Sequence, residues 1–337
     1  MAKFLARARY IAGALVLLVA IAVAAPLSAQ QPSPVNPTAQ SVKEEQLFQQ
    51  LRQLDGRVSI PDQKSGVLIQ PAGQDWRAFN QGTLHWIGGI AIVGMLALLI
   101  VFYTMRGMIK ISRGRSGRTI TRFNGLERFT HWLTASTFVI LAISGVNITF
   151  GKSLLLPLIS PEAFGTFSQW AKYAHNYLSF PFAIGVVLIF LLWIKDNIPG
   201  SVDVRWLREG GGIIGDKHPP AKRFNAGQKI VYWVVVLGGG AVAISGYLLM
   251  FPFYGTSIEG MQLAAVIHGL VGVLLIAAML AHIYIGTLGM EGAFEAMGTG
   301  EVDLNWAEEH HKLWVDEELE RAGVAHSGAR RPAAART

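Results

Sequence analysis

The 337-residue chain contains no cysteine, and charged residues make up only 15% of it. Without cysteine it cannot form disulfides, thiolate zinc sites or iron–sulfur clusters of its own. Any iron–sulfur relay that works with this chain must therefore belong to a partner. Because 51% of its residues are hydrophobic, the composition is that of a protein with several membrane spans rather than of a soluble domain.

The net charge of +7 does not by itself indicate nucleic-acid binding. The basic residues lie mainly in short loops beside apolar segments, and the positive-inside rule for membrane proteins explains that placement better. We therefore expect a membrane lipid environment and no nucleic-acid partner.

The N-terminal part of the chain predicts export. Residues 1–29 have a basic start, an apolar core and a small-residue end, which is the pattern of a secretory signal peptide cleaved after Ala29. An uncleaved anchor helix is the alternative, and in either case the following segment is exported. Residues 30–80 are polar and rich in Gln and Pro, and they predict a small or partly disordered periplasmic segment.

Five apolar segments follow, each long enough to cross a hydrocarbon core of about 30 Å as a helix. They lie near residues 84–105, 130–150, 172–194, 230–251 and 262–288. The predicted fold class is therefore all-α, an integral membrane helical bundle.

Loop charge predicts the direction of these spans. The 106–128 loop carries seven Lys or Arg residues and a single Glu, whereas the 151–171 loop carries one Lys and one Glu. The first loop should face the cytoplasm and the second the periplasm. By alternation, residues 195–229 are cytoplasmic and the mature N-terminus is periplasmic. The 316–337 segment is then a cytoplasmic tail, which we expect to be partly disordered.

Two histidines share the last apolar segment. His268 and His282 are fourteen residues apart, which separates them by roughly 21 Å along a helix and returns them to nearly the same face. An imidazole in hydrocarbon needs a partner, and such a pair suits two haems stacked across a bilayer. Two histidines that only form interhelical hydrogen bonds are the alternative.

The topology sorts four histidines into two depths. His131 and His282 lie near the cytoplasmic side, and His175 and His268 lie near the periplasmic side. Two bis-histidine haems would satisfy all four imidazoles and leave no open coordination position, which favours electron transfer. His85 also begins a span on the periplasmic side and could replace His175, although a His-Trp pair at the start of a span is ordinary in an interfacial aromatic belt.

The remaining histidines, among them His310 and His311, lie outside the spans, where histidines are usually solvated. The His310-His311 pair could alternatively bind a partner or a stray metal ion.

From Phe123 onward the chain resembles the gamma subunit of bacterial respiratory formate dehydrogenase, its membrane cytochrome b subunit. The resemblance covers roughly residues 122–315, and the Asn-Ala-Gly-Gln-Lys block and the fourteen-residue His spacing are its specific parts. The matching pieces are Arg128-Phe129-Thr130-His131-Trp132, Asn197-Ile198-Pro199, Trp206-Leu207, Phe224-Asn225-Ala226-Gly227-Gln228-Lys229, Ile267-His268, His282-Ile283-Tyr284 and Trp306-Ala307-Glu308-Glu309-His310-His311.

The resemblance implies a four-helix di-haem cytochrome b core, with the span near 84–105 as an extra N-terminal helix that the compact family form lacks. It implies that the four span histidines ligate two b haems, paired as His131 with His282 and His175 with His268. It also implies a quinone site on the cytoplasmic side, where menaquinone or ubiquinone would be the acceptor. Its residues here are Asn225, Gly227, Gln228 and His282.

The same resemblance implies a complex in the bacterial inner membrane. A periplasmic alpha subunit with a molybdenum or tungsten pterin would oxidise formate, and an iron–sulfur beta subunit would pass electrons to this chain. Whether the heterotrimer assembles further is open. The alternatives are the cytochrome b subunit of a hydrogenase or another periplasmic oxidoreductase, and a membrane anchor without haem.

Overall fold

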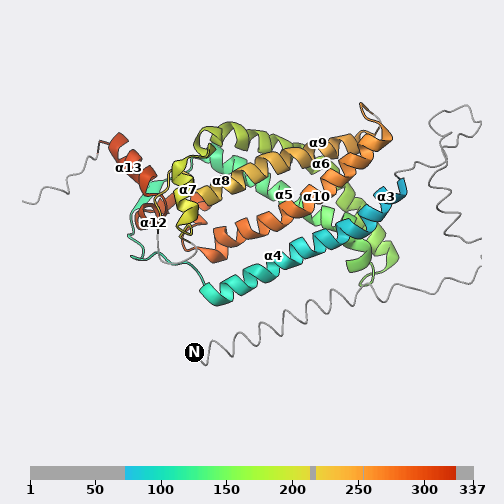
Figure 1. The fold of residues 1–337 in the computed structure, drawn as a ribbon, viewed down its shortest axis with the longest axis horizontal. Helices are drawn as coiled ribbons and strands as arrows, with labels where there is room; N and C mark the ends of the chain where they lie inside the picture. The colour runs from blue at the N-terminus through green and yellow to red at the C-terminus, as the bar shows by residue number, and fades with distance from the viewer. Residues whose placement is uncertain (1–72, 213–217, 253, 324–337) are drawn as a thin grey trace, which may run out of the picture.

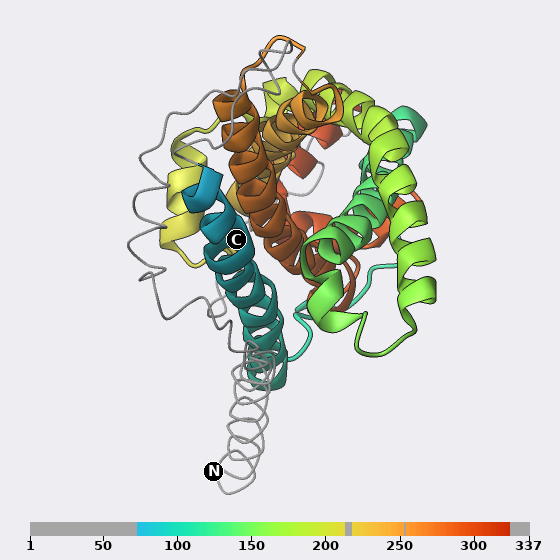
Figure 2. The same cartoon turned by 90° about the vertical axis from the view of Figure 1, so that its right-hand side faces the viewer.

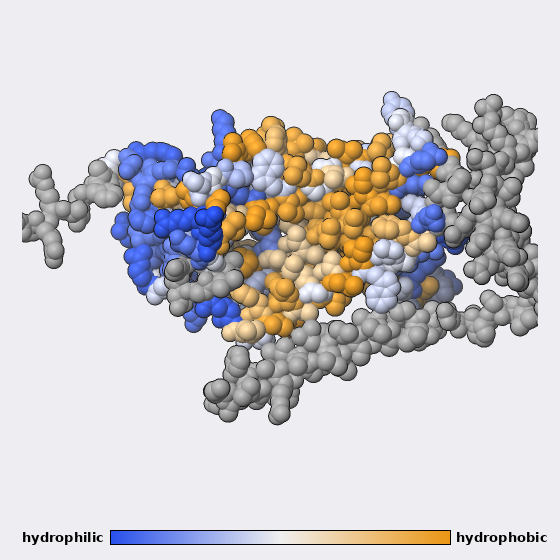
Figure 3. All heavy atoms as spheres, viewed as in Figure 1, coloured by the Kyte–Doolittle hydropathy of each residue, from blue (hydrophilic) through white to orange (hydrophobic). Residues whose placement is uncertain are grey.

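The structure is a computed structural model that describes residues 73–212, 218–252 and 254–323. Within these residues it is almost entirely helical, and five helices are long and apolar enough to cross a membrane (Figure 1). The five spans are Asp75–Arg106, Gly125–Leu154, Pro161–Asn197, Ala226–Met250 and Ile258–Gly289. Figure 3 shows apolar residues as a band around the middle of the bundle, with polar residues gathered at its two ends. The protein is therefore a multi-pass membrane protein of the predicted all-α class.

Several predicted segments fall partly or wholly outside the described residues. The predicted signal peptide and nearly all of the 30–80 segment lie there, as do residues 324–337. Of the predicted tail, the described part is helical as far as Arg321.

The first span is longer than its apolar core predicts. It runs from Asp75 in α3 (Gly73–Ala78) through the π-helical turn η1 (Phe79–Thr83) to the end of α4 (Leu84–Arg106). It packs on the fifth span, where a Cβ atom at Gly269 would lie 2.6 Å from the Leu84 side chain. Small residues are what allow membrane helices to approach so closely.

The second and third spans form one long antiparallel pair. Helix α5 (Gly125–Leu154) begins at a capping box, in which Asn124 and Glu127 each bond the other's main-chain N–H. Helix α6 (Pro161–Trp193) is capped by Ser160 and is followed by a short 3-10 turn, η2 (Ile194–Asn197). The two helices pack along their length, and Figure 2 shows them on the opposite side of the fifth span from α4.

The fourth and fifth spans form the second antiparallel pair. The fourth is α8 (Ala226–Trp233), the π turn η3 (Val234–Gly238) and α9 (Gly239–Met250). The fifth is α10 (Ile258–Tyr284) with the π turn η4 (Ile285–Gly289). Helix α10 packs against α4 and α9 over much of its length but touches α5 at few positions.

A small compact layer, which we call the cap, covers one end of the bundle (Figure 1). It contains an antiparallel pair of strands, β1 (Thr119–Thr121) and β2 (Glu301–Asp303), in which Ile120 pairs with Val302. Around it lie α11 (Glu295–Gly298), α12 (Leu304–His310) and α13 (Lys312–Arg321). The short helix α7 (Ser201–Arg208) lies at the same end. Buried aromatic residues join the cap to α5, α6 and α8: Phe123, Trp193, Phe224, Tyr232, Trp306 and Trp314.

Charged side chains also join the helices at this end. The carboxylate of Glu127 is almost fully buried and accepts hydrogen bonds from Arg223 (2.7 Å) and from the indole N–H of Trp193 (2.8 Å). Arg223 also donates to Asp196 (3.0 Å). A buried carboxylate that loses its cation is left with an uncompensated desolvation cost.

We expect Arg223→Ala to lower the free energy of unfolding by about 2–4 kcal/mol, because it leaves the buried carboxylate of Glu127 without its cation. Chemical unfolding in detergent, followed by tryptophan fluorescence, measures the change. The matched control is Arg205→Ala, which removes an exposed ion pair with Glu209 and should change stability by less than about 1 kcal/mol. Equal losses in the two variants would show that the Glu127 network does not stabilise this end.

Candidate functional site: two facing histidine pairs

His131 on α5 faces His282 on α10 near the end of the bundle that carries the cap. Their ring centroids are 6.2 Å apart, with an angle of 61° between the ring planes. The two side chains come from different helix pairs, and their own helices, α5 and α10, approach each other at few positions. The structure therefore brings together the first predicted pair.

His175 on α6 faces His268 on α10 in the other half of the bundle. Their ring centroids are 5.9 Å apart. Fourteen residues separate His268 from His282, which corresponds to roughly 21 Å along α10. The second predicted pair thus lies at a different depth from the first.

The geometry of both pairs fits an iron held between two imidazoles. An iron–nitrogen bond of about 2 Å on each side would place the two ring centroids about 6 Å apart. Among the described residues no group of three or more His, Asp or Glu could hold a metal ion. Each pair can thus supply two ligands, and a macrocycle would have to supply the others, as it does in haem.

Hydrogen bonds fix the tautomer of the His175–His268 pair. The Nδ1 atom of His175 lies 2.8 Å from the hydroxyl of Ser144, which itself donates to main-chain carbonyls of α5. The Nδ1 atom of His268 lies 3.0 Å from the carbonyl of Val242. Both Nδ1 atoms must therefore carry the proton, and both Nε2 atoms keep a free lone pair for a metal. In the other pair, Nδ1 of His131 is buried and has no hydrogen-bond partner among the residues that the structure describes.

Glycines lie directly against the second pair. A Cβ atom at Gly145 would lie 3.5 Å from the His175 ring, and one at Gly246 would lie 3.1 Å from the His268 ring. Gly145 also stands fourteen residues after His131, so the same face of α5 meets both pairs. The space beside these rings exists because neither glycine has a side chain.

His85, the rival candidate for the second pair, has other contacts. Its Nδ1 atom lies 2.9 Å from the carbonyl of Asn80, and its ring packs edge-on against Phe150 at 5.1 Å. The ring that lies opposite His268 belongs to His175.

Two of the residues expected at the quinone site form a helix cap. The Asn225 side-chain oxygen accepts from the main-chain N–H of Gln228 (2.9 Å), and the Gln228 side-chain oxygen accepts from that of Asn225 (3.1 Å). Both oxygens are thus committed to starting α8, as the sequence alone would suggest for this motif. The amide nitrogens of the two side chains donate no hydrogen bond within the described part of the chain.

The third residue, Gly227, lies against an indole ring. A Cβ atom here would lie 3.2 Å from Trp206 of α7. Trp206 is itself buried, so a larger residue at this position would displace α7.

The sequence reasoning missed a buried network beneath the cap. The Arg122 side chain is only 3% exposed, and its Nη2 donates to Gln228 (3.4 Å), to Nε2 of His311 (3.1 Å) and to the carbonyl of Arg223 (2.6 Å). Since arginine can only donate, His311 carries its proton on Nδ1, which donates to the carbonyl of Lys222 (2.8 Å). In the sequence, Arg122 is one of the seven basic residues of the 106–128 loop, and loop charge predicts only the direction of the spans.

Burial sets the charge states in this network. It lowers the pKa of Arg122 to about 9, with the nearby Arg223 adding to the effect, so Arg122 stays charged at neutral pH. Burial and the charge of Arg122 hold the pKa of His311 well below its usual range, and burial lowers that of His310 to about 4. Both histidines are therefore neutral and buried, and the expectation that they are solvated was wrong. The sequence offered one signal, the Glu-Glu-His-His motif at the end of the resemblance.

Arg128, the last basic residue of the 106–128 loop, also bonds to a neighbouring segment. Its guanidinium donates to the main-chain carbonyls of Met297 and Gly298. It therefore joins α5 to the end of α11.

Comparison with known proteins agrees with this geometry. Residues 122–300, which contain all four paired histidines, match the sequence pattern of the prokaryotic cytochrome b561 family. The chain belongs to this family, whose members bind haem b. Two relatives come from Escherichia coli K12. The cytochrome b556(Fdn) subunit of nitrate-inducible formate dehydrogenase is 26% identical over 61% of this chain and 94% of its own length. The cytochrome b556(fdo) subunit of formate dehydrogenase is 29% identical over 59% of this chain and 93% of its own length. The formate dehydrogenase cytochrome b556 subunit of Haemophilus influenzae is 27% identical over 63% of this chain and 88% of its own length.

We expect Gly246→Leu to lower the amount of haem b bound per protein, because the new side chain must push the His268 ring out of position. A pyridine haem assay on the purified protein measures this. Gly240→Leu on the same helix is the control, since a Cβ atom there meets nothing within 4 Å. Normal haem content in Gly246→Leu would contradict the proposal that a haem lies beside His268 in the space left by Gly246.

Proposed function

We propose that this protein is the membrane cytochrome b subunit of a respiratory formate dehydrogenase. In this role it carries electrons from a periplasmic iron–sulfur subunit, through two b haems, to a quinone reduced at the cytoplasmic side. The observation that carries the proposal is the pair of facing imidazoles at each of two depths in the bundle. The names of its relatives support formate dehydrogenase as the complex.

The residues that would hold the haems are His131 with His282 and His175 with His268. When bound, each haem would supply a one-electron centre without an open coordination position. The chain's own contribution is to hold the imidazoles: Ser144 and Val242 orient the rings of the second pair. Acceptors on Nδ1 also make an imidazole a stronger electron donor to its metal. Among the described residues, His175 and His268 have such acceptors.

The direction of transfer follows from the loop charges. If the basic 106–128 loop faces the cytoplasm, the cap and His282 lie on that side and His175 and His268 lie nearer the periplasm. Electrons would then enter at the second pair and leave at the first. The inner membrane of a bacterium is the compartment that such a topology and an exported N-terminus imply.

The donor must be a separate subunit, since the chain has no cysteine for an iron–sulfur cluster. An iron–sulfur beta subunit and a pterin-containing alpha subunit would complete the complex. Membership of the prokaryotic cytochrome b561 family does not by itself determine the electron donor, so a hydrogenase or another periplasmic oxidoreductase is the competing partner. Identification of the proteins that copurify with the chain distinguishes these, and formate-dependent reduction of the haem tests the proposal directly.

The acceptor site would lie beside Asn225, Gly227, Gln228 and His282. The two carboxamides use their oxygens to cap α8, and this fixes both side chains with amide nitrogens that donate to none of the described residues. Such nitrogens can donate to the carbonyl oxygens of a quinone. Arg122 and His311 would hold the Gln228 carboxamide in this orientation from beneath the cap.

The two-haem proposal predicts that His175→Ala and His268→Ala each lose one haem while the haem between His131 and His282 remains. Formate should then no longer reduce the remaining haem at the parent rate, because the entry point for electrons is missing. Haem stoichiometry and the formate-reduced and dithionite-reduced spectra measure both effects. His85→Ala is the matched control and should keep both haems; loss of a haem in that variant instead would favour the rival ligand.

The quinone site can be separated from the helix cap by isosteric changes. Asn225→Asp and Gln228→Glu keep the capping oxygens but remove the amide donors. We expect them to slow quinone reduction by roughly ten- to a hundredfold, the cost of about 1–3 kcal/mol for one lost buried hydrogen bond. Haem content should not change, and reoxidation of reduced haem by a quinone is the measurement. Parent rates in both variants would leave these residues with the capping role alone.

A further inference from the structure

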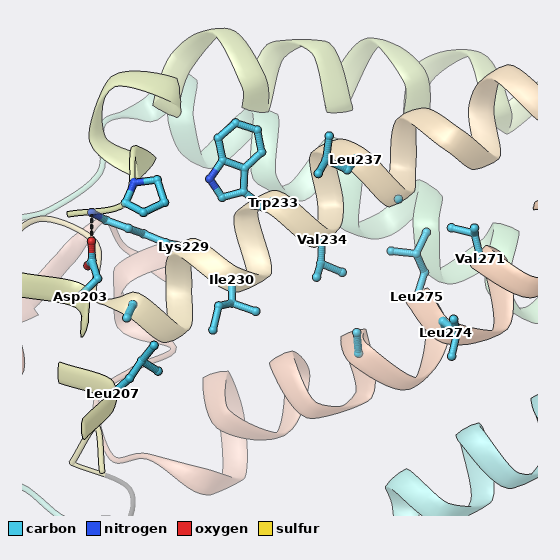
Figure 4. A pocket seen from close by; sticks show the side chains of 14 residues that line it. Asp203, Leu207, Lys229, Ile230, Trp233, Val234, Leu237, Val271, Leu274 and Leu275 are labelled. Atoms are coloured by element: carbon cyan, nitrogen blue, oxygen red, sulfur yellow. Dashed lines mark hydrogen bonds and ion pairs between the residues drawn. The ribbon is translucent and has the colours of Figure 1, made fainter. Parts of the chain in front are cut away.

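An apolar groove lies between the fourth and fifth spans, on the lipid-facing surface. Figure 4 shows its side chains projecting from α8 and η3 on one wall and from α10 on the other. Its volume is about 580 Å³, within the range of about 300–1,000 Å³ typical of ligand sites. We call it the α8–α10 groove.

The sequence builds one continuous wall of this groove. Ala226, Ile230, Trp233 and Leu237 recur every three or four residues and so share one face of the helix. Ile230 and Leu237 are 53% and 65% exposed and form its rim, while Ala226 is buried at its base. The wall is apolar throughout except at its first turn.

The opposite wall belongs to the helix that carries the histidines. Leu274, Leu275 and Ala278 of α10 line the groove, and His282 is one turn beyond Ala278. The two walls close on each other at Gly238, where a Cβ atom would lie 2.9 Å from Leu275. The groove therefore opens toward the end of the bundle that holds His282 and the start of α8.

A buried ion pair marks that open end. The Nζ atom of Lys229 donates to Asp203 (2.9 Å) and to the carbonyl of Ile198 (2.9 Å), and the side chains of Lys229 and Asp203 are 9% and 12% exposed. An ammonium group has three N–H donors, and two of them are used by these acceptors within the described part of the chain, which leaves the third for a ligand. Because Asp203 neutralises the lysine, the end of the groove offers a donor without net positive charge.

We propose that the α8–α10 groove binds the polyprenyl tail of the quinone, with the quinone head at the end marked by Lys229. The inference rests on the proposed function, because it assumes a quinone beside His282. A long hydrocarbon chain matches the apolar walls and the opening to lipid. A phospholipid is a poorer occupant, because its anionic phosphate would meet a cation that is already neutralised.

The test fills the groove and compares two quinones that differ in the tail. Chemically reduced holoprotein is mixed with menaquinone-4, which has a prenyl tail, or with menadione, which has none, and haem reoxidation is followed. We expect Ala278→Phe to raise the concentration of menaquinone-4 needed for half-maximal rate by about tenfold, through lost burial of the tail. The value for menadione should stay at that of the parent protein.

Two further variants keep the result interpretable. Leu274→Trp fills the groove from its exposed rim, where a larger side chain should not disturb the fold. Like Ala278→Phe, it should raise the concentration of menaquinone-4 needed for half-maximal rate. Leu98→Trp is the matched control on the lipid-facing side of α4 and should change neither quinone. The haem spectrum of each variant checks that the bundle is intact.

An equal effect on both quinones, or no effect on either, would overturn the tail site while leaving the proposed function in place. If neither quinone reoxidises the haem of the parent protein, the proposed function fails, and the tail site fails with it.

Discussion

An imidazole inside a hydrocarbon layer cannot stay without a partner, and four of them set the arrangement of this bundle. Each histidine comes from a long apolar helix, and each faces another histidine from the opposite helix pair. Helix α5 packs closely on α6, and α10 packs closely on α4 and α9, whereas α5 and α10 touch at few positions. Gly145 and Gly246 leave space beside the rings of His175 and His268. The nitrogens of these rings bond to the hydroxyl of Ser144 and the carbonyl of Val242. Two imidazoles at about iron-bridging distance on each level make haem b the group that this arrangement fits.

The cap depends on the same end of the bundle. Glu127 starts α5 and bonds Arg223 and Trp193, so one buried carboxylate joins the second span, the third span and the segment before the fourth. Arg122 and His311 then connect the cap to Gln228 at the start of α8. Gln228, one of the side chains proposed to meet the quinone, is thus bonded by the buried charge of Arg122, which lies outside the spans. A change in the cap would therefore be felt at that site.

The sequence allowed the main outline of the fold to be predicted. Apolar length predicted the five spans, and the class is confirmed. The same-face spacing of His268 and His282 predicted that they meet two partners at different depths. Helix ends were less predictable, since α3 and η1 extend the first span through polar residues that the apolar pattern does not include.

What the sequence could not predict depends on contacts between distant segments. The burial of His311 requires α12 to fold onto Arg122, which is 189 positions away along the chain. The groove exists because α8 and α10 diverge, and no local pattern encodes the angle between two helices. Asn225 and Gln228 were predicted from the sequence as a helix cap and as hydrogen-bond donors to a quinone. Their side-chain oxygens form the helix cap, and their amide nitrogens are left to act as the donors.

A potentiometric titration of the purified protein, with the haem absorbance followed in the presence and absence of carbon monoxide, tests most directly whether two bis-histidine haems lie in this bundle. We predict two one-electron steps of b-type haem per chain, neither of them altered by carbon monoxide, because neither iron has an open coordination position. A single step, no haem absorbance, or a reduced haem that binds carbon monoxide would contradict the assignment of the two histidine pairs.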